Sequence, residues 1–264
     1  MTEQEGDDAQ DLPLTSMESM DAKQQMQNRL YKSEMAKAAG KFNLKPKNGI
    51  KYLTDKGFLP KEPMEDHVKG ITRFLKETPA LSATIIGQFM GEDKELNKNV
   101  LSQYIDEMDF TNKEWSFAAC MKSFLTGFRI PGEGQIIDRY MEKFGEKLSR
   151  DRPEDFGNTE GVYLLAYATL MLQTSVHNPQ AHKMKMSLQD FRKITMGVKL
   201  NDDPTFVFDD FLEDVYNTVL RDPFTLEEDE DARMKIEAAS STNKKLLFDK
   251  EREGILRRGA AVLK

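Results

Sequence analysis

The chain has 264 residues, of which 39% are hydrophobic and 31% are charged, and its formal net charge is -7. This length and composition predict one large soluble domain with terminal extensions, because the apolar residues suffice for a core. The longest apolar stretch, residues 162–172, is shorter than the roughly 18–20 residues that span a membrane, and we expect no secretory signal. A single cysteine, Cys120, excludes an internal disulfide and indicates a reducing, cytosolic setting.

The charges are concentrated toward the two ends of the chain. Residues 1–15 carry five acidic and no basic residues, residues 227–231 read EEDED, and residues 232–264 carry nine basic and four acidic residues. The region between, residues 16–226, has a net charge of only -2. This balance predicts no nucleic-acid partner, no general attraction to an anionic membrane and no direct membrane insertion.

Helices are predicted along almost the whole chain, because apolar residues recur with the 3.6-residue period. The first covers residues 16–41, and Gly40 suits its C-cap. Further helices are predicted at residues 67–77, 81–90, 96–108, 112–128, 135–144, 159–175, 206–220 and 243–263. One more helix is predicted to begin after a capping box formed by Ser187 and Asp190. No stretch alternates like a strand, so we expect an all-α fold in which the strongly apolar helix 159–175 is central.

The same patterns suggest how the chain is divided. Residues 1–15 are polar and acidic, which predicts a disordered tail. Residues 16–226 form the predicted domain, and residues 227–264 form an acidic linker followed by a helical extension.

Most catalytic motifs are missing from the sequence. It has no phosphate-binding loop, no dinucleotide-binding glycine pattern, no nucleophile elbow and no set of kinase motifs. His67, His177 and His182 do not have the spacing of metal ligands. We therefore expect no metal site and no cofactor.

Two polar interruptions of the helical pattern remain as candidate sites. In "FRIPGEGQIIDR" (128–139), Pro131 and Gly132 break the helix just before Glu133. In "TSVHNP" (174–179), a polar turn ends the most apolar helix. Each has an ordinary structural explanation: Glu133 suits the dipole of the following helix, and the turn is a helix stop before proline.

Together, the two segments resemble a known family. "FRIPGEGQIIDR" and "YLLAYATLMLQTSVHNP" are similar to the first and second motifs of the Sec-seven (Sec7) domain, the catalytic module of guanine-nucleotide exchange factors for Arf GTPases. The resemblance covers about residues 40–226, and "FNLKPKNGIKYL" looks most like the large Golgi (BIG-type) branch. It implies an elongated right-handed array of about ten helices with a hydrophobic groove.

The resemblance also implies roles for individual residues. Glu133 matches the glutamate finger, which expels GDP and magnesium from the GTPase so that GTP can load. Phe128 and Ile130 match supports of the finger loop. Groove positions that hold the partner are matched by Tyr167, Leu170, Met171 and Asn178. Where the family usually has alanine, this chain has Gly134, and Gln173 replaces a frequent asparagine or threonine.

The function implied is Arf activation in vesicle trafficking. The partner would be an Arf-family GTPase, GDP-bound or nucleotide-free, and the location cytoplasmic, at the periphery of Golgi or endosomal membranes reached through other segments. Two alternatives remain open from the residues alone. One is an all-α Arf-binding module without exchange activity, and the other is a helical scaffold unrelated to GTPases.

Overall fold

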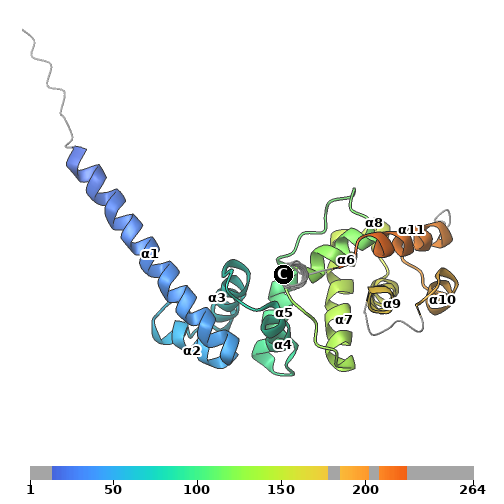
Figure 1. Ribbon diagram of the computed structural model, residues 1–264, viewed down its shortest axis with the longest axis horizontal. Coiled ribbons are helices and arrows are strands. Elements are labelled where there is room, and N and C mark those ends of the chain that lie inside the picture. The colour runs from blue at the N-terminus through green and yellow to red at the C-terminus, as the bar shows by residue number, and fades with distance from the viewer. Residues whose placement is uncertain (1–13, 178–184, 202–207, 225–264) are drawn as a thin grey trace, which may run out of the picture. The chain divides into compact units, whose positions relative to one another are not determined.

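The computed structural model describes residues 14–177, 185–201 and 208–224 (Figure 1). Within these ranges there are eleven α-helices and no strand, so the all-α prediction is confirmed. The predicted acidic tail up to residue 13 and the predicted extension at 227–264 lie outside the described residues. Contacts divide the chain into two compact units, Met1–Leu81 and Ser82–Lys264.

The first unit consists of α1 (Leu14–Leu44), α2 (Pro46–Asp55) and α3 (Met64–Glu77). α1 begins at Leu14, so it includes the last two residues of the predicted disordered tail. It continues through Gly40 to Leu44, so the predicted C-cap at Gly40 is wrong. The helix continues because Phe42 is fully buried against α2, where a Cβ on Gly49 would lie only 2.6 Å from the Phe42 Cβ. The helix ends where Pro46 forces Lys45 into an extended conformation.

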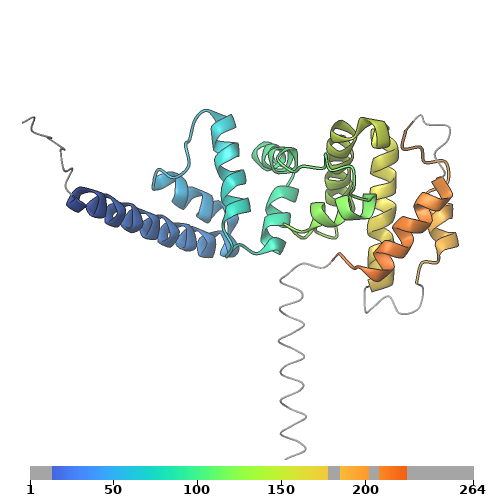
Figure 2. The same cartoon turned by 90° about the horizontal axis from the view of Figure 1, so that it is seen from above.

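Only the second half of α1 takes part in this packing. The rings of Phe42 and Phe74 meet edge to face at 5.8 Å, and Leu53, Ile71 and Leu75 complete the core around them. The first half of α1 extends beyond α2 and α3 (Figures 1 and 2). Every residue from Gln24 to Ser33 is exposed.

The second unit contains the eight remaining helices. They are α4 (Ala83–Gly91), α5 (Glu95–Asp106), α6 (Phe117–Leu125), α7 (Gly134–Asp151), α8 (Pro153–Phe156), α9 (Thr159–His177), α10 (Leu188–Ile194) and α11 (Phe208–Arg221). α9 lies between α7 and α11, as both ribbon views show (Figures 1 and 2). The buried residues of α9, among them Val162, Leu165 and Thr169, lie on one broad side of the helix, whereas Leu164 and Met171 are 44% and 46% exposed. The predicted central position therefore holds for its place between α7 and α11, but one side of α9 stays open.

The helix ends in this unit confirm one prediction from the sequence and correct another. The predicted capping box is present, because the Ser187 hydroxyl accepts from the Asp190 amide and the Asp190 carboxylate accepts from Ser187. The helix predicted at residues 112–128 is shorter, since α6 begins only after Ser116, whose side chain caps it. Trp115, predicted to be buried in that helix, lies half-buried in the preceding loop. In the part of the chain that the structure describes, no helix is long and apolar enough to cross a membrane.

Candidate partner-binding groove

The loop between α6 and α7 is anchored by a buried aromatic residue. Phe128 is only 1% exposed, and its ring lies 5.3 Å from that of Phe124, 5.7 Å from Tyr104 and 5.0 Å from Tyr140. Aromatic contacts at these spacings stabilise beyond the area that they bury. The start of the loop therefore has a fixed position relative to α5, α6 and α7.

The other support of this loop is α4. The Arg129 amide donates to the carbonyl oxygen of Ala83 at 2.9 Å, and a Cβ on Gly87 would overlap the Arg129 carbonyl group. Tyr140 adds a hydrogen bond from its hydroxyl to the carbonyl oxygen of Gly87, at 2.9 Å. This support was not predicted from the sequence, where Gly87 in "LSATIIGQFM" was the only sign of a close approach.

Glu133 lies at the exposed end of the loop, at the N-cap of α7. Its backbone is extended (φ -83°, ψ 124°), and its carbonyl oxygen accepts from the amides of Ile136 at 2.9 Å and Ile137 at 3.0 Å. The side chain makes no capping hydrogen bond and is exposed. A Cβ added to Gly132 or Gly134 would meet nothing within 4 Å, so the surroundings of the carboxylate are open.

An apolar hollow of about 430 Å³ lies beside this loop. Its lining joins the two sequence motifs, since Phe128, Ile130 and Gly132 come from the loop and Leu170 comes from α9. The lining residues that were not predicted are Leu125, Arg129, Ile137, Gln173, Thr174 and Phe224. Leu125 and Ile137 had a signal in the sequence, because Ile137 is an apolar residue within the first motif and Leu125 is one just before it. Phe224 had none, because it is brought here by the packing of α11.

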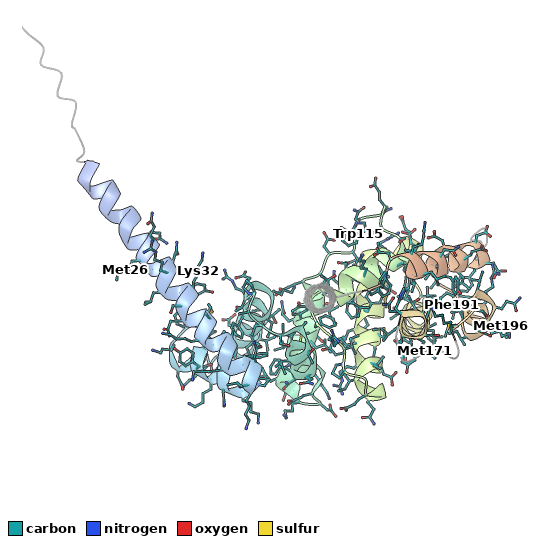
Figure 3. All side chains as sticks on the ribbon, viewed as in Figure 1. Met26, Lys32, Trp115, Met171, Phe191 and Met196 are labelled. Carbon is teal, nitrogen blue, oxygen red and sulfur yellow. The ribbon has the colours of Figure 1, made fainter. Side chains whose placement is uncertain are left out.

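Two other predicted groove residues lie outside the lining of this hollow. Tyr167 and Met171 lie on the face of α9 that also carries Leu170, because residues three and four apart are neighbours on a helix. Tyr167 is half-buried, with its ring 6.4 Å from that of Tyr163. Met171 is 46% exposed and visible on α9 in Figure 3. The last predicted groove residue, Asn178, lies outside the described residues.

The end of α9 is held by polar contacts. A ring nitrogen of His177, Nε2, lies 2.7 Å from the carbonyl oxygen of Val219 in α11, and the Ser175 hydroxyl accepts from the Met186 amide at 2.8 Å. One polar atom of the groove residues has no such contact. The side-chain oxygen of Gln173 is buried and has no hydrogen-bond partner among the described residues.

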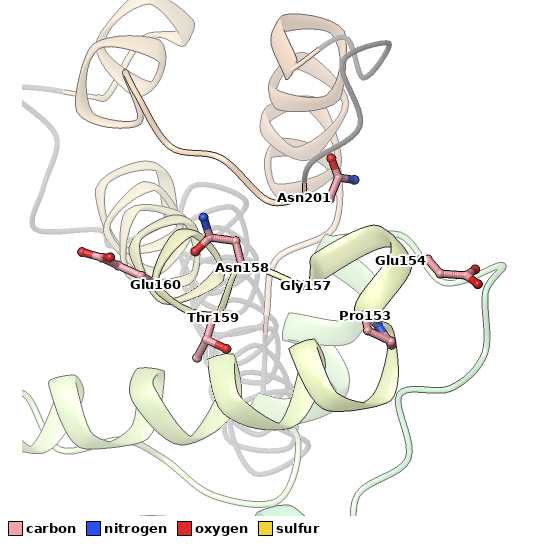
Figure 4. Close-up of a pocket in the computed structure, with 7 residues that line it drawn as sticks. All are labelled: Pro153, Glu154, Gly157, Asn158, Thr159, Glu160 and Asn201. Atoms are coloured by element: carbon pink, nitrogen blue, oxygen red, sulfur yellow. The ribbon is translucent and has the colours of Figure 1, made fainter.

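A second hollow, at the turn between α8 and α9, is polar (Figure 4). Its side chains hold the helix ends together. The Asn158 side-chain oxygen accepts from the Gly161 amide at 3.0 Å, and the Asn201 amide group donates to the carbonyl oxygen of Asp155 at 3.1 Å. These bonds explain the polar residues structurally. Within the described ranges, no group of three histidine, cysteine or carboxylate side chains could hold a metal ion.

The second unit is thus an all-α domain with an open apolar hollow, and Glu133 is exposed on the loop beside it. The family model of the Sec7 domain matches residues 31–224. The chain therefore belongs to the Sec7 domain family.

Individual relatives agree with this assignment. The chain is 36% identical to brefeldin A-inhibited guanine nucleotide-exchange protein 2 of Arabidopsis thaliana over 223 residues, which cover 84% of this chain and 12% of that protein. It is 33% identical to mouse cytohesin-2, covering 82% of this chain and 52% of the relative. The chain thus spans about an eighth of the length of the large exchange proteins that it matches.

Solved structures give the same result. The Sec7p catalytic domain is 36% identical with a TM-score of 0.61, covering 71% of this chain and 94% of that one. A Sec7 domain solved with ARF1-GDP and brefeldin A is 29% identical with a TM-score of 0.62, covering 75% and 95%. Both share the helical fold of this chain.

Proposed function

We propose that this chain is a guanine-nucleotide exchange factor for Arf-family GTPases, acting in vesicle trafficking. One observation carries the proposal: Glu133 is exposed at the N-cap of α7 without capping the helix, directly beside the hollow that joins both motifs. Family membership and the ARF1-GDP complex of a related Sec7 domain support the choice of partner.

In the proposed mechanism, the groove binds the GTPase and Glu133 disturbs its nucleotide site. GTPases hold GDP largely through magnesium and a cradled β-phosphate. A carboxylate that enters this site repels the phosphate and competes for the metal ion and the phosphate-binding lysine. The affinity for GDP falls, and GTP from solution replaces it. The apolar lining supplies the docking energy that offsets this unfavourable insertion.

Under this proposal the chain is a catalyst of exchange that makes or breaks no covalent bond, so it needs no cofactor of its own. We place it in the cytoplasm, at the periphery of Golgi or endosomal membranes. The apolar groove would serve docking equally well in a module that binds Arf without exchange. The position of Glu133 favours exchange, because an uncapped, open carboxylate adds nothing to docking on an apolar surface.

The test is the release of labelled GDP from a purified Arf protein. The chain should accelerate release, and Glu133→Lys should slow that acceleration roughly a hundredfold, the effect of losing one positioned electrostatic group. Because lysine attracts the β-phosphate, the variant should also coelute with GDP-loaded Arf on gel filtration. The matched control is Glu142→Lys, which reverses an exposed charge on the same helix.

Each alternative gives a different result in this assay. Binding of Arf without release by the unmodified chain would indicate the binding module, and absence of any complex would contradict both functions. If Glu133→Lys exchanged nucleotide at the rate of the unmodified chain, Glu133 would be only a helix-start residue.

A further inference from the structure

A strong positive charge lies in residues 29–61 of the first unit, although the body of the chain is nearly neutral on average. Between Arg29 and Lys61, nine residues are basic and two are acidic, a net charge of +7. All nine basic residues are exposed. Of the two acidic residues, Glu34 is only 8% exposed, and Asp55 is paired with Lys51 at 2.7 Å. The surface of α1 and α2 is therefore basic.

Exposed apolar side chains share this surface. Met26, Leu30 and Leu44 are 74%, 64% and 89% exposed, and Lys37 and Lys41 lie between them in the sequence. At 100° per residue, these five positions fall within about a sixth of the circumference of α1. Figure 3 shows Met26 on the half of the helix that extends beyond α2 and α3. Large aliphatic side chains are exposed here on a helix face that also carries positive charge.

The lysines of this face are arranged by a buried polar group. Glu34 accepts hydrogen bonds from the Lys37 ammonium and from the Tyr52 hydroxyl, each at 2.6 Å. Above the ring of Tyr52 lie the ammonium groups of Lys41, at 5.3 Å, and Lys56, at 5.8 Å. These contacts hold three ammonium groups close to one another on the α1–α2 surface, which concentrates positive charge beside the apolar stripe.

We propose that the α1–α2 hairpin binds the surface of a membrane that contains anionic lipids. The basic side chains lie at the lipid headgroups, and Met26, Leu30 and Leu44 enter the interface between headgroups and acyl chains. Long lysine side chains suit this arrangement, because their stems lie along apolar surface while the ammonium groups stay at the headgroups. The helix lies on the membrane and does not cross it.

The apolar stripe decides between a lipid surface and a nucleic acid. Both would bind the positive charge, but a phosphate backbone gains nothing from three exposed aliphatic side chains. An anionic membrane uses both features, because electrostatic attraction and burial of apolar area add. This inference goes beyond nucleotide exchange. It also differs from the expectation drawn from the average charge, because averaging over residues 16–226 cancels the positive charge of residues 29–61.

The experiment measures how the full chain partitions onto vesicles of phosphatidylcholine with about a third phosphatidylserine, compared with phosphatidylcholine alone. Binding should require the serine lipid and should weaken as salt screens the charges. The combined variant Lys41→Gln, Lys45→Gln and Lys47→Gln should lower partitioning roughly a hundredfold. The matched control makes the same charge change in the second unit, with Lys94→Gln, Lys98→Gln and Lys113→Gln, and should keep most of the binding.

A second variant tests the apolar stripe without changing the charge. Met26→Gln, Leu30→Gln and Leu44→Gln together should lower partitioning at least about tenfold. All three residues are exposed, so the thermal midpoint should be unchanged. Glu133→Lys should bind vesicles like the unmodified chain, which separates this inference from the proposed exchange activity.

Three results would overturn the proposal. The first is that the unmodified chain fails to bind serine-containing vesicles at low salt. Another is normal binding by the apolar variant, which would show that charge alone acts. Finally, a duplex oligonucleotide that displaces the chain from vesicles at low concentration would assign the basic surface to nucleic acid.

Discussion

The amide of Arg129 donates a hydrogen bond to the carbonyl oxygen of Ala83 at 2.9 Å, which fastens the loop that carries Glu133 to the start of α4. The two backbones approach this closely because Gly87, one turn further along α4, has no side chain. The position of the proposed catalytic carboxylate therefore depends on a helix that contributes no residue to the groove.

Gly87→Ala should displace this loop. An added Cβ would overlap the Arg129 carbonyl group, and a backbone atom cannot move aside as a side chain can. We expect a loss of about 1–3 kcal/mol in stability. Nucleotide exchange should slow by roughly ten- to a hundredfold, because small misplacements of a reacting group are costly. The control is Gly40→Ala, a helical glycine with open space around it. An unchanged exchange rate in Gly87→Ala would show that the loop does not depend on α4.

Gly134→Ala should stabilise the protein. Gly134 is the first residue of α7, its φ is not positive, and an added Cβ meets nothing within 4 Å. Replacing glycine there lowers the entropy of the unfolded chain by up to about 1 kcal/mol, which raises the thermal midpoint by about 2–4 °C. Exchange should not slow. The same substitution at Gly197, where φ is +86°, should instead destabilise the protein. A lowered midpoint in Gly134→Ala would contradict the open geometry of the loop.

Met171→Asp should abolish docking while the fold is kept. Met171 is 46% exposed on the face of α9 beside the groove, so a carboxylate there stays hydrated in the free protein. In a complex it would be buried against an apolar partner surface, which is costly. The thermal midpoint should change little, corresponding to within about 1 kcal/mol. Met196→Asp, at a position that is 84% exposed, should affect neither binding nor stability. A large drop in the midpoint of Met171→Asp would place Met171 in the core.

The protein should lose stability between about pH 10 and pH 12 as buried tyrosines ionise. Burial raises the pKa of Tyr104 to about 12, and it raises the pKa of Tyr140 further. The folded state therefore holds the Tyr104 proton more tightly than the unfolded state does. Its contribution, about 2–3 kcal/mol, is fully present below the unfolded pKa near 10 and is lost as the pH rises through the folded pKa.

The measurement is urea unfolding at several alkaline pH values for the unmodified chain and Tyr104→Phe. Lysine ion pairs also weaken in this range, so the difference between the two slopes reports the tyrosine. The variant should lose stability less steeply with pH. Equal slopes would mean that Tyr104 ionises without opposing the fold.

The helical class and the two motifs follow from the sequence alone. Apolar residues at 3.6-residue spacing are enough to form helices, and the predicted capping box at Ser187 depends only on residues three apart. The prediction that Glu133 lies at a break before α7 followed from Pro131 and Gly132 alone. These features are local, so neighbouring residues decide them.

The surroundings of those motifs depend on contacts between segments that are distant in the sequence. Gly40 suits a C-cap, but burial of Phe42 continues α1 past it. Phe224 reaches the groove through α11, and Gly87 fastens the loop through α4. The net charge of residues 16–226 concealed the positive surface of residues 29–61, because a net charge does not say which residues share a surface. Contacts between distant segments depend on packing, and packing depends on shape and volume that no local pattern encodes.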